Sequence, residues 1–192
     1  MVKHQEPDTT VIINYNPQLR VVYDMKRGDI ILYSGSGPTS WLIRKITGYK
    51  WSHVAWILSP RTILESDAKE GGVTINPIQT YVTPNKVIKG KTKIVRLTHV
   101  DPGLLENAIE ASLKKVGQRY DYSSIFHLAW MYFLRFFGIK INMHDCKTNR
   151  QTCVELIARP MLKHANWRCF DEVDIDETVP GHFDITDKTK EI

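Results

Sequence analysis

The chain has 192 residues, of which 42% are hydrophobic and 24% charged. This composition is typical of one globular domain with a hydrophobic core, and it excludes a disordered or low-complexity chain. Lysine and arginine number 26 against 21 aspartates and glutamates, which gives a formal net charge of +5. No run of four basic residues concentrates this charge, so we expect no nucleic-acid partner.

The cysteine count and the terminal segments constrain where the protein works. Three cysteines are an odd number and too few to staple a domain of this size, which predicts free thiols in a reducing compartment. The first residues contain no apolar segment typical of a signal peptide. We therefore expect an intracellular protein, in a cytoplasmic or a virus- or phage-associated setting. We expect one domain over 1–192, with polar, poorly ordered tails at about 1–18 and 184–192.

The predicted secondary structure places most strands before the main helices. In chain order we expect a strand at 29–33, a helix at 40–47 ended by Gly48, strands at 51–58, 63–65, 73–75 and 93–97, and a helix from the N-cap Asp101 to Gly117. Strands followed by helices predict an α+β fold with an antiparallel sheet rather than alternating β-α units.

A cysteine stands at a predicted helix N-terminus. Thr152 and Glu155 have the Thr-x-x-Glu spacing of a capping box before an apolar run, so Cys153 is the first helical residue. Unpaired backbone N–H groups and the positive end of the helix dipole favour a thiolate there. The same N–H groups can bind an oxyanion. The simpler interpretation is a small buried thiol, and the charge of Glu155 opposes a thiolate unless the cap uses it. Pro160 predicts a kink or an end of this helix about two turns later.

A thiolate nucleophile needs a base, and His53 is the strongest candidate among seven histidines. It lies in an aromatic-rich strand, where an ionisable ring needs a partner. Glu65 on the next strand is the nearest carboxylate, but pairing of Leu58 with Ile63 across a four-residue turn would place it on the opposite face. A three- or five-residue loop, or a bulge, places both on one face, and we predict such a connection.

Other chemistries lack their motifs. The glycines at 35–37 are not followed by the Gly-Lys-Ser/Thr of a phosphate loop. The spacings of His144, Cys146, Cys153 and Cys169 match no common zinc site, and Ser36 lacks the nucleophile elbow of a serine hydrolase. We therefore expect no metal and no cofactor.

Five short segments in order resemble the circularly permuted, papain-like NlpC-type amidases of the YiiX/YebB-like group. They are Gly28-Asp29, Ser52-His53-Val54, Glu65, Gly117-Gln118-Arg119-Tyr120-Asp121 and Cys153-Val154-Glu155-Leu156-Ile157. The order of histidine before cysteine is the sign of permutation. The resemblance implies a permuted papain-like fold, with an antiparallel sheet or partial barrel packed against helices. It also implies that Cys153 is the nucleophile, His53 the base and Glu65 the residue that orients the imidazole, with Tyr120 beside the nucleophile as an oxyanion ligand.

The segment 125–137 is apolar on nearly all sides of a helix. Ile125, Leu128, Ala129, Tyr132, Phe133 and Phe136 form an ordinary core stripe, and the other face carries Phe126, Trp130 and Leu134. The segment is either a core helix or the carrier of an exposed patch for an acyl chain, a membrane surface or a partner protein. It is too short to span a bilayer.

Two classes of function remain. The first is a cysteine-dependent hydrolase that forms a thioester on Cys153 and acts on a small peptide, an amide or an acyl-lipid substrate. An amidase or peptidase, and an acyl hydrolase or transferase like the related lecithin retinol acyltransferase group, are not separated by these residues. The alternative is a catalytically silent module that binds lipid or peptide on the same fold. An enzyme requires Cys153 to be partly exposed and within reach of His53.

Overall fold

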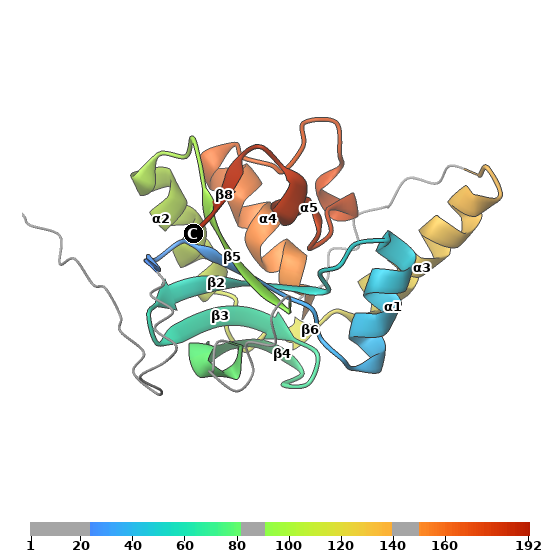
Figure 1. The fold of residues 1–192 in the computed structure, drawn as a ribbon, viewed down its shortest axis with the longest axis horizontal. Coiled ribbons are helices and arrows are strands. Elements are labelled where there is room, and N and C mark those ends of the chain that lie inside the picture. Colours follow the sequence, from blue (N-terminus) through green and yellow to red (C-terminus); the bar gives the residue numbers. More distant parts are fainter. Residues whose placement is uncertain (1–23, 82–90, 140–149) are drawn as a thin grey trace, which may run out of the picture.

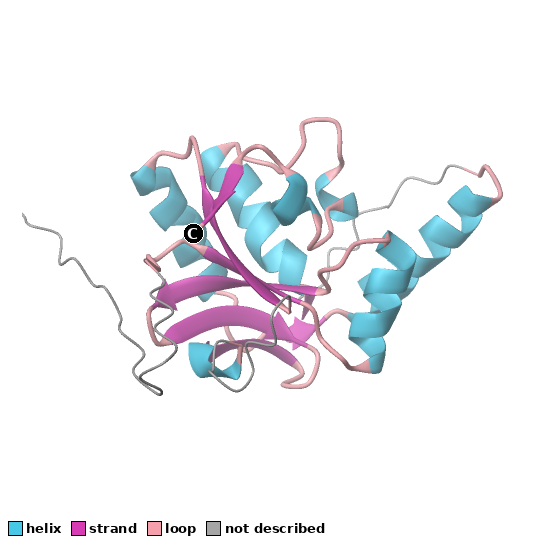
Figure 2. Ribbon diagram, in the orientation of Figure 1, coloured by secondary structure: helices cyan, strands magenta, loops and turns pink. Residues whose placement is uncertain are grey.

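A computed structural model describes residues 24–81, 91–139 and 150–192, and the expected N-terminal tail at 1–18 lies outside these residues. The strands form one curled sheet in the order β7-β6-β4-β3-β2-β1-β5-β8 (Figures 1 and 2). All neighbours in it pair antiparallel, except β6 and β7, which are parallel. The strands are β1 Ile30–Tyr33, β2 His53–Ser59, β3 Thr62–Asp67, β4 Gly72–Pro77, β5 Thr92–Leu97, β6 Arg119–Tyr120, β7 Arg150–Gln151 and β8 Thr189–Glu191. The expected α+β class is confirmed.

The helices lie against the sheet or project from it (Figure 1). They are α1 Pro38–Thr47, α2 Pro102–Leu113, α3 Tyr122–Phe136, α4 Cys153–Ala165 and α5 His182–Ile185, with 3-10 turns η1 Ile78–Thr80 and η2 Ile175–Glu177. The predicted end of α1 at Gly48, which has φ +73°, is confirmed, and so is the N-cap Asp101 of α2, whose carboxylate accepts the Gly103 and Leu104 N–H groups. The predicted end of α2 at Gly117 is wrong, because the helix ends at Leu113. No helix among the described residues is long and apolar enough to cross a membrane.

Alternation along the strands divides the hydrophobic core into two layers. Ile30, Val54, Trp56 and Leu64 belong to the larger layer, together with residues of α2 and α4 such as Leu156. The intervening strand residues, such as Ala55, Ile57 and Ile63, belong to a second layer with η1. A sheet that is covered on both faces in this way gives its strands continuous apolar runs, and it provides a rigid frame for residues at the strand ends.

Helix α4 continues through Pro160 to Ala165, so of the kink or end expected at this proline, the end does not occur. Proline lacks the N–H that the carbonyl of Leu156 would accept. The buried Ser112 hydroxyl of α2 lies 2.8 Å from that carbonyl and replaces the missing donor. A hydrogen bond between two helices therefore compensates for the proline within one of them.

The C-terminal residues are ordered in the fold, contrary to our expectation for 184–192. Residues Thr189–Glu191 form β8 and pair with β5 over Val95 to Leu97. Asp184 accepts hydrogen bonds from the Trp51 indole and from Lys93, at 2.6 Å each. Polar side chains are compatible with a strand here because β8 lies at the edge of the sheet, where they meet solvent.

Helix α3 projects beyond α1, along which only its N-terminal part runs (Figure 1). Ile125 is buried, as expected for the core stripe, and Phe126 and Trp130 are exposed, as expected for the opposite face. Leu134 is only half-buried. The expectation that Phe133 is a core residue is wrong: it is 53% exposed, because the projecting part of α3 has no sheet beneath it.

Candidate active site

The predicted capping box positions Cys153. The Thr152 hydroxyl accepts the Glu155 N–H, and the Glu155 carboxylate accepts the Thr152 N–H at 2.8 Å. The other oxygen of Glu155 pairs with Arg159 at 3.0 Å. The negative charge of Glu155 is therefore used by the cap and by an arginine.

The connection between β2 and β3 has the predicted odd length. Ile57 pairs with Ile63 and Ser59 with Thr62, so Leu58 is an extra residue in a bulge. This register places Glu65 on the same face as His53. The two side chains meet, with His53 Nε2 2.6 Å from Glu65 Oε2. Because this bond uses Nε2, the ring nitrogen left for Cys153 is Nδ1.

His53 links the carboxylate to the thiol. Burial alone would lower the pKa of His53, but hydrogen bonds and charge attraction from Cys153 and Glu65 outweigh it and raise that pKa well above its ordinary value. Burial likewise opposes ionisation of Glu65, and the hydrogen bonds from His53, Tyr81 and Asn76 reverse this and lower its pKa. The site therefore favours a charged imidazole between the Glu65 carboxylate and the Cys153 thiol, which is the charge state that a base partner of a thiol nucleophile requires.

Two further residues of this site, Tyr81 and Asn76, were not predicted from the sequence. Tyr81 donates its hydroxyl to Glu65 Oε2 at 2.6 Å, and its ring stacks against His53 at a centroid distance of 5.7 Å. The Asn76 amide donates to Glu65 Oε1 at 2.9 Å. Glu65 is fully buried and accepts three hydrogen bonds, so its orientation is fixed. Asn76 could have been found, because it lies on the strand next to Glu65. Tyr81 follows a short turn and has no sequence signal.

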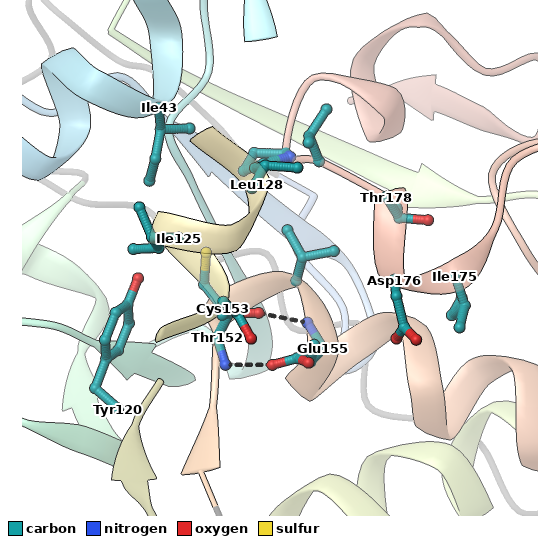
Figure 3. Close-up of a pocket in the computed structure, with 14 residues that line it drawn as sticks. Ile43, Tyr120, Ile125, Leu128, Thr152, Cys153, Glu155, Ile175, Asp176 and Thr178 are labelled. Atoms are coloured by element: carbon teal, nitrogen blue, oxygen red, sulfur yellow. Dashed lines mark hydrogen bonds between the residues drawn. The ribbon is translucent and has the colours of Figure 1, made fainter. Parts of the chain in front are cut away.

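A pocket lies at the N-terminus of α4 (Figure 3). Its lining includes Cys153, Tyr120 and Thr152, together with apolar residues such as Ile43 and Ile125. Burial and the charge of Cys153 raise the pKa of Tyr120 well above its ordinary value, so its hydroxyl is a neutral donor at pH 7. Cys153 itself is only 3% exposed. Cys153 is near enough to His53 to raise the pKa of that histidine, but the expected partial exposure of the thiol is not found.

The residues that the structure describes contain no group of three or more His, Cys, Asp or Glu side chains that could hold a metal ion. Two members of the rejected zinc set, His144 and Cys146, lie outside the described residues. A third, Cys169, is a buried free thiol whose pKa burial raises to about 12. A thiol with so high a pKa is inert at neutral pH, so Cys169 provides an internal standard for the reactivity of Cys153.

Comparison with known proteins identifies a fold. No family model matches the chain, and no curated protein matches it. Among solved structures, it resembles the metalloprotein YiiX from Escherichia coli O157:H7, with a TM-score of 0.57 and 16% sequence identity, over 87% of this chain and 96% of that one. The chain therefore has a YiiX-like α+β fold, with a curled sheet and packed helices.

Proposed function

We propose that the protein is a cysteine hydrolase of the permuted papain-like, NlpC-type class, with Cys153, His53 and Glu65 as its catalytic group. The observation that supports this most directly is the 2.6 Å bond between Glu65 and His53, together with the raised pKa of His53, to which Cys153 contributes from a capped helix N-terminus. A merely structural histidine needs one partner. This one is held between a buried carboxylate and a thiol, and the thiol lines a pocket.

The reaction follows from the positions of these groups. The Cys153 thiolate attacks the carbonyl carbon of an amide or ester, and the carbonyl oxygen takes the displaced electron pair. The tetrahedral intermediate collapses, the bond to the leaving nitrogen or oxygen breaks, and the His53 imidazolium gives its proton to that atom. A thioester on Cys153 remains. Neutral His53 then takes a proton from water, whose oxygen attacks the thioester, releases the acid and restores the thiolate.

The oxyanion of the intermediate needs donors on the other side of the carbonyl. The Cys153 N–H belongs to the first turn of α4, where backbone N–H groups have no carbonyl partner within the helix. The neutral hydroxyl of Tyr120 lines the same pocket. We assign these two donors to the oxyanion, and Glu65 to holding the tautomer and charge of His53.

The residues present do not fit a catalytic metal. The solved relative is titled a metalloprotein. In this chain the described residues offer no cluster of three metal-ligating side chains, and the carboxylate of Glu65 is used in three hydrogen bonds. We derive no step through a metal ion.

The substrate we propose has an acyl part next to the scissile bond, as in an acylated amide or an acyl lipid. Four lining residues come from α1 and α3, and three of them are apolar, namely Ile43, Ile125 and Leu128; the fourth is Ser124. Ile125 is buried and also lines an apolar groove between these helices, so it separates this groove from the pocket. Shortening it in Ile125→Ala opens this route, and we expect faster reaction of Cys153 with a small alkylating reagent.

The function is tested by alkylation of Cys153 with iodoacetamide over a range of pH, read by peptide mass spectrometry. We expect labelling that persists to about pH 6, because the imidazolium stabilises the thiolate, and slower labelling in His53→Ala. Cys169 in the same sample serves as the control for buried thiols. Labelling that follows an ordinary thiol, with a pKa near about 8.5, and that ignores His53 would contradict the hydrolase. The silent binding module would then be the better explanation.

A further inference from the structure

The exposed aromatic side chains gather in one part of the molecule. Among the described residues, all six that are exposed lie on α1, on α3 or directly after α3: Trp41, Tyr122, Phe126, Trp130, Phe133 and Phe137. Their exposed fractions range from 46% to 69%. Scattered single aromatics are ordinary on a protein surface, but a contiguous group marks a contact site. We call α1 and α3, with Phe137, the aromatic arm.

The exposed aromatic residues of α3, together with Phe137, form one stripe. Tyr122, Phe126, Trp130, Phe133 and Phe137 are spaced four, four, three and four residues apart, which places them within about 80° around a helix. Trp130 stacks on Phe133 at 5.6 Å, and Phe133 contacts Phe137 edge-on at 5.1 Å. The stripe is about 22 Å long at the rise of an α-helix, and its outer half projects from the body (Figure 1).

The charged residues of the arm have one sign. Neither α1 nor α3 contains an aspartate or glutamate, whereas the sequence of α1 includes Lys45 and Arg44, of which Arg44 donates to the Gly35 carbonyl, and the sequence of α3 includes Arg135. Lys45 is exposed and stands four residues after Trp41, on the same side of α1. The Tyr122 hydroxyl donates to the carbonyl of Ala68, and the opposite charges of the following Lys69 and Glu70 cancel. An aromatic stripe on helices whose only charged residues are cations complements a surface with an apolar interior and anionic groups at its boundary with water.

We infer that the aromatic arm binds the surface of an anionic phospholipid bilayer, with α3 lying in the plane of the interface. Tryptophan, tyrosine and phenylalanine favour the boundary between headgroups and acyl chains. The cations meet the lipid phosphates and carboxylates. A protein partner would instead be recognised through a polar rim with both donors and acceptors, and the two helices supply no carboxylate for it.

Binding of the arm to a bilayer would also place the candidate active site near the lipid. The binding itself does not require that Cys153 be catalytic. The groove between α1 and α3 is lined by Trp41, Tyr122 and Phe126 from the arm, and it meets the pocket of Cys153 at Ile125. Docking of the arm would hold the groove against the lipid surface. An acyl chain that leaves the bilayer would then reach the groove before it reaches the thiol.

The test is a binding titration of the full chain with vesicles of phosphatidylcholine containing about 30% phosphatidylserine, compared with phosphatidylcholine alone. We expect tighter binding to the anionic vesicles, and a loss of about tenfold or more in Trp130→Ser/Phe133→Ser. Lys45→Gln should lose about fivefold, and only on anionic vesicles, because one lysine near such a surface contributes about 1 kcal/mol. Both serine sites are exposed, so the variant keeps the core intact.

The matched control is Leu104→Ser, which removes an exposed apolar side chain from α2, and its binding should equal that of the wild type. Cys153→Ala should also bind normally, so failure of the hydrolase would leave this inference standing. The inference is wrong if the wild type binds neither vesicle. It is also wrong if Leu104→Ser loses as much vesicle affinity as the arm variant. A third contrary result would be an arm variant that no longer self-associates in gel filtration but binds vesicles like the wild type.

Discussion

Replacement of Glu65 by glutamine tests whether a buried carboxylate activates the thiol. The glutamine carbonyl can take the place of Glu65 Oε2 and accept from His53 and Tyr81, now at 2.6 Å each. Its NH2 then faces Asn76, whose amide can rotate to present its oxygen. The substitution therefore keeps the shape and the hydrogen bonds of the site and removes only the charge.

The expected magnitude follows from these bonds. A hydrogen bond to an ionised group contributes about 1.5 to 3 kcal/mol, and a neutral one about 0.5 to 1.5 kcal/mol. The imidazolium of His53 therefore loses about 1.5 kcal/mol of stabilisation, which is about a tenfold smaller population of the thiolate–imidazolium pair. We expect Glu65→Gln to be alkylated at Cys153 about tenfold more slowly at pH 6.

The assay is the rate of iodoacetamide labelling at pH 6, with circular dichroism to confirm folding. Glu106→Gln is the control, because it removes a surface carboxylate that pairs with Arg27. If folded Glu65→Gln reacts at the rate of the wild type, the charge of Glu65 does not reach the thiol, and the proposed role of this residue fails.

Three further perturbations have defined outcomes. Tyr81→Phe removes one donor to Glu65; we expect a loss of about 1 to 2 kcal/mol in urea unfolding, and an unchanged midpoint would contradict the hydrogen bond. Ser112→Ala leaves the Leu156 carbonyl without a donor, so the thermal midpoint should fall by the equivalent of about 1 to 3 kcal/mol, whereas a wild-type midpoint would mean that the proline needs no compensation. Stability should also depend on pH at both ends. The lowered pKa of Glu65 gives stability that is present above its ordinary value of 4.5 and lost as pH falls. The raised pKa of His53 gives stability that is present below 6.5 and lost as pH rises through the folded value. His53→Ala should remove the alkaline loss, and urea midpoints at a series of pH values measure it.

The local parts of the site could be predicted from the sequence, because they depend on neighbours within one turn. The capping box needs only Thr152 and Glu155, and it places Cys153 on its own. The pairing of β2 with β3 can place Glu65 on only two faces of the sheet, the face of His53 or the opposite one. The need of His53 for a carboxylate partner was enough to predict the first of these.

The missed features depend on contacts that sequence patterns do not contain. Tyr81 reaches Glu65 from a segment after the sheet hairpin. Strand β8 is short and polar, so its sequence looks like that of a disordered tail. Only its pairing with β5 in the folded protein identifies it as a strand. The periodicity of α3 gave Phe133 a core position, but periodicity cannot tell which part of a helix extends past the body it packs on.

The bulge at Leu58 restricts how the hairpin can vary in length. Surface loops ordinarily tolerate insertions and deletions. Here five residues separate the paired Ile57 and Ile63, and an odd count is what turns Glu65 toward His53. Loss or gain of one residue would turn the carboxylate to the opposite face, while a change of two would restore it. Chains that keep this site should therefore differ in this loop by even numbers of residues.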